Sequence, residues 1–129
     1  MKIKFNGNIP SLKNSKQIFK NSKTGKNFIT SSEITKKYLA EYEYQWADKK
    51  LVKKFRTKIE KLKKPYKIGF YFIRSSKRKF DYINILQLPC DLMVKYGWID
   101  DDNCDEIIPI ILGYCINKEE AGIEIEILN

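Results

Sequence analysis

The feature that most restricts the fold is the apolar run YKIGFYFIR, residues 66–74. Ile68, Phe70 and Phe72 alternate with other residues, and alternate side chains of an extended chain point to the same face. The run therefore predicts a central β-strand, around which the rest of the chain has to pack.

Three other segments are predicted strands, and two of them show the same alternation. In residues 1–10 the apolar Ile3 and Phe5 alternate with lysines, and Pro10 follows. This pattern is typical of a short, half-buried strand that ends at the proline. Residues 105–116 and 121–128 complete the chain as two further predicted strands, the second alternating isoleucine with glutamate.

Between the predicted strand in residues 1–10 and the central strand at residues 66–74, the pattern changes to helical spacing. Residues 11–30 are rich in Lys, Asn, Ser and Gly, and they predict a basic loop with a turn at Thr24-Gly25 that leads into a short extended segment, NFITS. Residues 33–64 then place apolar residues near every third or fourth position. One long helix, or two in tandem, is expected, capped by Ser31 or Ser32 and ending before Pro65.

A second helical pattern covers residues 84–97 and closes at Gly97. Pro89 lies within it, so either the helix begins late and holds Pro89 in its first turn, or the proline kinks it. A chain of 129 residues is long enough for one core, and no repeat or long linker divides it. We expect a single small α+β domain over residues 1–129, with a mixed β-sheet and packed helices.

The charge is divided unevenly along the chain. Residues 1–80 hold 23 Lys or Arg and 5 Asp or Glu, a net charge of +18, whereas residues 81–129 hold 2 and 11, a net charge of −9. A basic surface of this size binds phosphates and releases counterions, which makes nucleic acid the first partner to consider. The alternative is that Lys-rich and Asn-rich composition reflects only solubility and an AT-rich genome.

Composition also argues against several classes of protein. No apolar run approaches the roughly 20 residues of a bilayer span, so a soluble chain without a membrane partner is expected. Nothing at the N-terminus is typical of an export signal. The chain has no histidine, and its three cysteines lack CxxC spacing, so we expect no zinc. Buried free thiols in a reducing cytoplasm are the expected state of the cysteines.

The negative charge gathers after residue 80. Asp81 falls after the central strand, Asp91 lies on the predicted helix one turn before Lys95, and residues 100–102 are three consecutive aspartates after that helix. A strand, a helix and a return loop can bring these carboxylates together at one end of the sheet. Carboxylates without histidine or thiolate suit a hard cation such as Mg²⁺. The same aspartate run is also typical of a solvated turn.

The stretch KFDYINILQLPCDLMVKYGWIDDDN resembles the catalytic region of the RusA family of Holliday junction resolvases. Asp81 and Asn84 match the first Asp and the Asn of that family's Asp-x-Asp-Asn motif, Asp91 matches a late helical Asp, and residues 98–101 supply Trp, an apolar residue and Asp-Asp in order. IPSLKNSKQIF near the N-terminus is similar to the family's opening Pro-Ser-x-Asn loop. ITSSEITKKY is similar to its Ser-containing helix start.

The resemblance implies a RusA-like fold, a homodimer in the cytoplasm of a bacterial host cell, and Mg²⁺-dependent (or Mn²⁺-dependent) hydrolysis of branched DNA such as four-way junctions. The implied catalytic residues are Asp81, Asn84, Asp91 and Asp101. The implied metal ligands are Asp81 and Asp101, with Asp100 and Asp102 as further candidates. Backbone phosphates would be held by Lys13, Lys16, Lys20, Lys23, Lys26, Lys77, Arg78 and Lys79.

Two positions depart from the family pattern: Ile83 stands where the second Asp is expected, and Gln87 where a Lys is expected. Asp91, Asp100 or Asp102 could complete a metal site, and Lys79 or Lys95 could supply the missing positive charge. The alternative is a RusA-like protein that binds branched DNA without cleaving it. A third interpretation is that the acidic C-terminal half binds a partner protein and the basic half serves only solubility.

Overall fold

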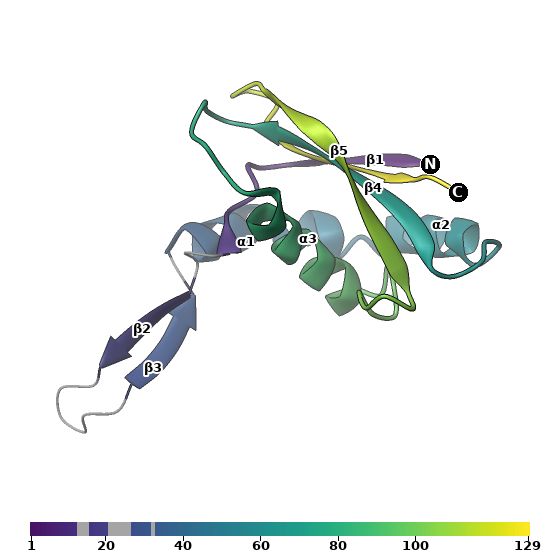
Figure 1. The fold of residues 1–129 in the computed structure, drawn as a ribbon, viewed down its shortest axis with the longest axis horizontal. Helices are drawn as coiled ribbons and strands as arrows, with labels where there is room; N and C mark the ends of the chain where they lie inside the picture. Colours follow the sequence, from purple (N-terminus) through teal and green to yellow (C-terminus); the bar gives the residue numbers. More distant parts are fainter. Residues whose placement is uncertain (13–15, 21–26, 32) are drawn as a thin grey trace.

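The computed structural model describes residues 1–12, 16–20, 27–31 and 33–129, and its largest element is a four-stranded mixed sheet (Figure 1). Its strands are, in spatial order, β1 (Lys2–Asn6), β6 (Gly122–Ile127), β4 (Tyr66–Arg74) and β5 (Ile107–Ile116). β4 pairs in parallel with β5 and antiparallel with β6, which in turn pairs antiparallel with β1. The predicted α+β class and the predicted interior position of residues 66–74 are confirmed.

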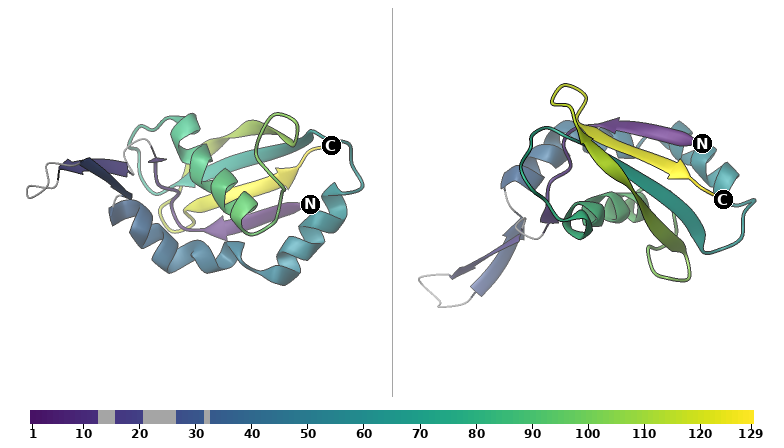
Figure 2. Two further views of the ribbon diagram at one scale, coloured as in Figure 1. Left: turned by 90° about the horizontal axis from the view of Figure 1, so that it is seen from below. Right: turned by 45° about the horizontal axis from the view of Figure 1, so that its top comes forward.

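Three helices lie on one side of this sheet: α1 (Glu33–Trp46), α2 (Lys49–Ile59) and α3 (Tyr82–Lys95). In the described part of the chain no helix covers the opposite face (Figures 1 and 2). α1 and α2 are the two tandem helices of the sequence prediction. They are separated at Asp48, whose side chain accepts hydrogen bonds from the backbone N–H groups of Lys50 (3.0 Å) and Leu51 (3.2 Å) and so starts a new helix.

A two-stranded hairpin extends away from the sheet (Figure 1). It pairs β2 (Lys16–Lys20) antiparallel with β3 (Asn27–Ser31). The prediction of loop throughout residues 11–26 is therefore wrong for residues 16–20, because QIF pairs with FIT across the ladder although Lys, Asn and Ser surround it. The predicted turn at Thr24-Gly25 and the predicted cap at Ser32 lie outside the described residues, and Ser31 ends β3.

α3 connects β4 to its parallel neighbour β5. Asp81 is the residue before its first turn, and Gly97, with φ of +79°, follows its C-terminal cap as predicted. Pro89 is buried in the interior of the helix, so the proposal that the helix begins late is wrong. This connection places the two ends of α3 at opposite ends of the strands that it joins.

The core centres on two fully buried tryptophans. The indole N–H of Trp98, in the loop after α3, donates to the backbone carbonyl of Trp46 (2.8 Å), and the indole N–H of Trp46 donates to the hydroxyl of Tyr38 (3.1 Å). Phe5 of β1 packs against both indoles at 4.5 and 5.7 Å between ring centroids. Burial raises the pKa of Tyr38 to about 12, which keeps its hydroxyl neutral.

The cysteines are free thiols, but they are not all buried as expected. Cys90 lies inside α3, and burial raises its pKa to about 12. Cys104 is exposed and Cys115 is half-buried. The correction follows from their positions, because Cys104 lies in the loop after α3 and Cys115 on the edge strand β5.

Replacing Trp98 by phenylalanine tests the tryptophan pair. Trp98→Phe should lower the free energy of unfolding by about 3 kcal/mol, because the buried carbonyl of Trp46 loses its donor and the smaller ring leaves a cavity. Urea denaturation measures the change. Tyr44→Phe, on an exposed ring, is the control and should change stability by less than about 0.5 kcal/mol. A cost for Trp98→Phe as small as that of the control would contradict this account.

Candidate nucleic-acid interface

Asp81 and Asn84 lie together on the surface at the start of α3. Asp81 has extended backbone angles, and its side chain makes no capping hydrogen bond to the helix. Its carboxylate instead accepts a hydrogen bond from the side-chain amide of Asn84 (3.1 Å). The structure thus brings together two of the implied catalytic residues, as an acid beside an amide.

The two departures from the RusA pattern lie on the same helix. Ile83 is 74% exposed, so an apolar group faces solvent two residues after Asp81. Gln87 donates to the carboxylate of Asp91 (2.9 Å), one turn further along. Neither residue brings charge to the start of α3, and Asp91 is held by a neutral amide.

A second acidic group lies beyond the other end of α3. Burial raises the pKa of Asp102, and hydrogen bonding to Asp101 and the negative charges of Asp101 and Asp91 raise it further. Asp101 in turn accepts hydrogen bonds from the backbone N–H of Asp102 (2.7 Å) and from the side chain of Asn103 (3.2 Å). Asp101 and Asp91 thus add to the effect of burial in disfavouring the charged form of Asp102.

Asp100 is not part of this acidic group. Its carboxylate pairs with Arg56 at 3.0 Å and with Lys64 at 3.5 Å. The Arg56 guanidinium, and more weakly Lys64, lower the pKa of Asp100. Asp100 thus anchors the loop after α3 to α2 and to the α2–β4 connection, which is a structural role and not that of a free metal ligand.

The predicted convergence of these carboxylates at one end of the sheet is wrong for a single chain. Asp81 precedes α3 and residues 100–102 follow it, and a helix of 14 residues is about 21 Å long at the normal rise. Because β4 and β5 are parallel, the end of β4 and the start of β5 lie at opposite ends of the sheet. Among the described residues, no group of three or more His, Cys, Asp or Glu side chains is arranged to hold a metal ion.

Lys95 also lies away from Asp81. It forms an ion pair of 2.5 Å with Glu43 of α1, and the hydroxyl of Tyr96 donates to the same carboxylate at 2.6 Å. These two hydrogen bonds lower the pKa of Glu43. Lys95 therefore joins α3 to α1, and it does not supply the charge that Gln87 lacks.

The connection from β4 to α3 is the basic surface closest to Asp81. Lys77, Arg78 and Lys79 are exposed, and in the part of the chain that the structure describes none of them pairs with an acid. Residues 76–82 line one pocket together with Tyr114 of β5. This arrangement places three unneutralised cations directly before the Asp81–Asn84 pair.

Two of the other predicted phosphate contacts belong to β2 of the hairpin. Lys16 and Lys20 are the first and last residues of β2. Lys13, Lys23 and Lys26 lie outside the described residues.

A second basic surface was not predicted from the sequence. Lysines of α2 and of the turn after it line one pocket together with Met1 and Thr57. They are Lys50, Lys53, Lys54, Lys58 and Lys61. The signal was present in the sequence, because these lysines recur at helical spacing on the side away from Phe55 and Ile59, both of which are buried.

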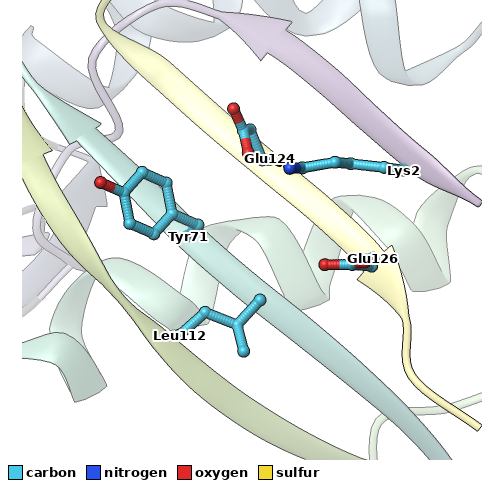
Figure 3. A pocket seen from close by; sticks show the side chains of 5 residues that line it. All are labelled: Lys2, Tyr71, Leu112, Glu124 and Glu126. Carbon is cyan, nitrogen blue, oxygen red and sulfur yellow. Dashed lines mark ion pairs between the residues drawn. The ribbon is translucent and has the colours of Figure 1, made fainter.

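The open face of the sheet has a different character. The pocket there is lined by Lys2, Tyr71, Leu112, Glu124 and Glu126 (Figure 3). Lys2 is paired with Glu124 at 3.2 Å. With two glutamates and a paired lysine this pocket is unfavourable for an anion, so the basic surfaces on the helical side are the better candidates for binding phosphate.

Comparison with protein-family models and with curated proteins found no match to this chain. No helix of the described part is long and apolar enough to span a membrane.

Replacing Asp102 tests the acidic group at the far end of α3. Asp102→Asn should raise the free energy of unfolding at pH 7 by up to about 0.5 kcal/mol, because the folded state disfavours the charged form at this largely exposed position. The gain should vanish as the pH falls below the raised pKa, where Asp102 is already protonated. Thermal unfolding between about pH 3 and pH 8 measures this gain, because the range brackets the usual carboxyl pKa of about 4.

Asp105→Asn, at an exposed acid of the same loop, is the matched control. It should show no comparable gain. If Asp102→Asn destabilised the protein at pH 7, the folded state would not disfavour the charged form of Asp102 as described.

Proposed function

We propose that this protein binds branched DNA and that it is RusA-like in doing so. The observation that carries the proposal is the run of three exposed cations, Lys77, Arg78 and Lys79, that leads into the Asp81–Asn84 pair and forms no ion pair with any described residue. Cations without acidic partners are free to neutralise phosphates, and the released counterions drive binding. The neighbouring polar pair offers hydrogen-bonding groups for the nucleotides that the cations hold.

The position of the second basic surface favours branched over linear DNA. The α2 lysines lie at one end of the helical side of the molecule, and the loop before α3 lies at the other (Figure 1). Two separated phosphate-binding surfaces suit two duplex arms that diverge from a branch point. Phosphate contacts of this kind fix the position of the DNA without reading its sequence.

The same proposal includes a homodimer in the cytoplasm of a bacterial host cell. A two-fold axis is the usual symmetry of soluble homo-oligomers, and it matches the symmetry of a four-way junction. The bacterial cytoplasm contains the DNA that would be bound, and its reducing conditions keep free thiols such as the exposed Cys104 stable.

Cleavage of the DNA, with Mg²⁺ or Mn²⁺ as cofactor, is the second candidate function. A single described chain does not present the required ligand set, because Asp81 lies at one end of α3 and Asp101 and Asp102 lie beyond the other. Burial raises the pKa of Asp102, and the negative charges of Asp101 and Asp91 add to it; this favours the candidate, since a bound cation would offset that negative charge. A two-fold axis across α3 sets the helix antiparallel to its copy, and Asp81 of one protomer then lies beside Asp101 of its partner.

Salt dependence tests the binding function. The triple variant Lys77→Gln/Arg78→Gln/Lys79→Gln should bind a four-way junction more weakly, and the slope of log K against log salt should fall by roughly 2 to 3, because each lost phosphate contact removes about 0.9. Fluorescence anisotropy with a labelled junction in EDTA measures both quantities.

The matched control removes three exposed lysines elsewhere: Lys4, Lys67 and Lys118. Lys4→Gln/Lys67→Gln/Lys118→Gln has the same net charge as the triple variant but should keep most of the affinity and slope. Equal losses in the two variants would mean that only net charge matters, and the proposed interface would be wrong.

Complementation tests cleavage and the dimer together. Asp81→Asn and Asp101→Asn should each abolish nicking of a junction in Mg²⁺. Mixing the two variants should restore about a quarter of the wild-type sites, because about half of the dimers are mixed and each of these holds one intact site. Gel electrophoresis of labelled strands measures nicking. Wild-type activity without any restoration in the mixture would place both aspartates in one chain's site, and inactive wild type would remove the cleavage candidate.

A further inference from the structure

Three aromatic rings meet beside the basic loop. Phe80 of that loop packs edge-to-face against Tyr114 of β5 (4.9 Å between centroids, 89°) and against Tyr82 of α3 (5.3 Å, 88°). Tyr82 and Tyr114 lie 6.3 Å apart at 68°. We call Phe80, Tyr82 and Tyr114 the aromatic group. It links the loop, the helix and the edge strand at one corner of the fold.

The aromatic group is held firmly from the core side. Tyr82 contacts the buried Phe72 at 6.4 Å between centroids. The guanidinium of Arg74 stacks over the ring of Phe80 at 4.8 Å and donates to the backbone carbonyl of Ile9 at 2.6 Å. The rings are therefore fixed in orientation before any ligand binds, which lowers the entropic cost of binding.

On its other side the aromatic group is open. Tyr114 is 49% exposed, and Ile83, which follows Tyr82 in α3, is 74% exposed. The pocket formed by residues 80–84 and the pocket formed by residues 76–82 with Tyr114 share Phe80, Asp81 and Tyr82.

The surroundings of these pockets indicate the ligand. Lys77, Arg78 and Lys79 supply unpaired positive charge at one side, and the rings and Ile83 supply apolar area. The Asp81 carboxylate can accept hydrogen bonds from the edge of a base, and the Asn84 amide can donate to that edge or accept from it. Cations for a phosphate, rings for a flat apolar face and polar groups for its edge are together the requirements of an unstacked nucleotide.

We propose that this corner binds a base that has left the stack at the branch point, with Tyr114 as the stacking surface and Ile83 as an apolar wedge beside it. The inference depends on the proposed binding of branched DNA and adds the part of that DNA which is recognised. It also gives Ile83 a role at a position where the RusA pattern has a carboxylate, because an apolar side chain in contact with base steps favours unstacking.

Affinities for three DNA probes test the proposal: a four-way junction, a single strand of about 20 nucleotides, and a linear duplex with the sequence of one junction arm. A single strand of this length covers roughly two OB-fold sites. Tyr114→Thr keeps a residue of high β-propensity on the strand and removes the ring. It should weaken binding to the junction and to the single strand by roughly 5- to 150-fold, the range for one lost base-stacking contact. Binding to the duplex should change less than about twofold, and the salt slope should not change because no phosphate contact is lost.

Ile83→Ser should weaken junction binding in the same selective way. Tyr44→Thr, at a 72% exposed tyrosine of α1, is the matched control and should leave all three affinities unchanged. Urea unfolding and sedimentation of each variant establish that fold and oligomeric state are retained.

Equal losses on all three probes, no loss on any, or loss of the wild-type oligomeric state in Tyr114→Thr would overturn this inference. A wild-type protein that binds the junction no better than the duplex would instead overturn the proposed function itself. The two proposals are separated if the wild type prefers the junction and Tyr114→Thr binds all three probes as the wild type does. Branched-DNA binding would then stand, and the base contact would be wrong.

Discussion

The hydrogen bond from the indole of Trp98 to the carbonyl of Trp46 fixes the far end of α3, and the arrangement of the candidate site depends on it. It ties the loop after α3 to the junction of α1 and α2, while Phe5 packs both indoles against β1. The near end of α3 is held separately, where Tyr82 and Phe80 pack around the end of β4. Because both ends are anchored, the helix keeps Asp81 and the aspartates after Trp98 apart, and any chemistry that needs both has to draw on a second copy.

Most of the fold was predictable because it depends on local patterns that the core enforces. Alternation in residues 66–74 predicted a central strand, and each inward side chain there, Ile68, Phe70 and Phe72, is fully buried. The predicted extended segment NFITS is confirmed as β3, but its partner β2 was missed because it has five residues in Lys-rich and Asn-rich sequence, so that only its pairing with β3 identifies it. The alternative of a late helix start at Pro89 was wrong because packing of α3 against the sheet overrides the cost of a proline inside the helix.

The candidate site was predictable as a set of residues but not as an arrangement. Chain order showed that Asp81, Asp91 and Asp101 belong to one strand–helix–loop unit, yet only the parallel pairing of β4 with β5 shows that the unit's ends lie apart. The interaction of Asp100 with Arg56 spans 44 residues of sequence, and no spacing rule reveals such a contact. The α2 lysines could have been found, because their helical spacing is visible in the printed sequence. The aromatic group could not, since Tyr114 joins Phe80 only through the packing of the edge strand.

The central claim is that DNA binds the helical side of the protein at the loop before α3. Amide hydrogen exchange with and without a four-way junction, in EDTA, tests it most directly because it maps contacts on the unmodified chain. Binding at this loop should slow exchange in residues 75–84 and in α2 and leave exchange in β1 and β6 unchanged. Exchange that is unaltered throughout, or protection confined to β1 and β6, would contradict it.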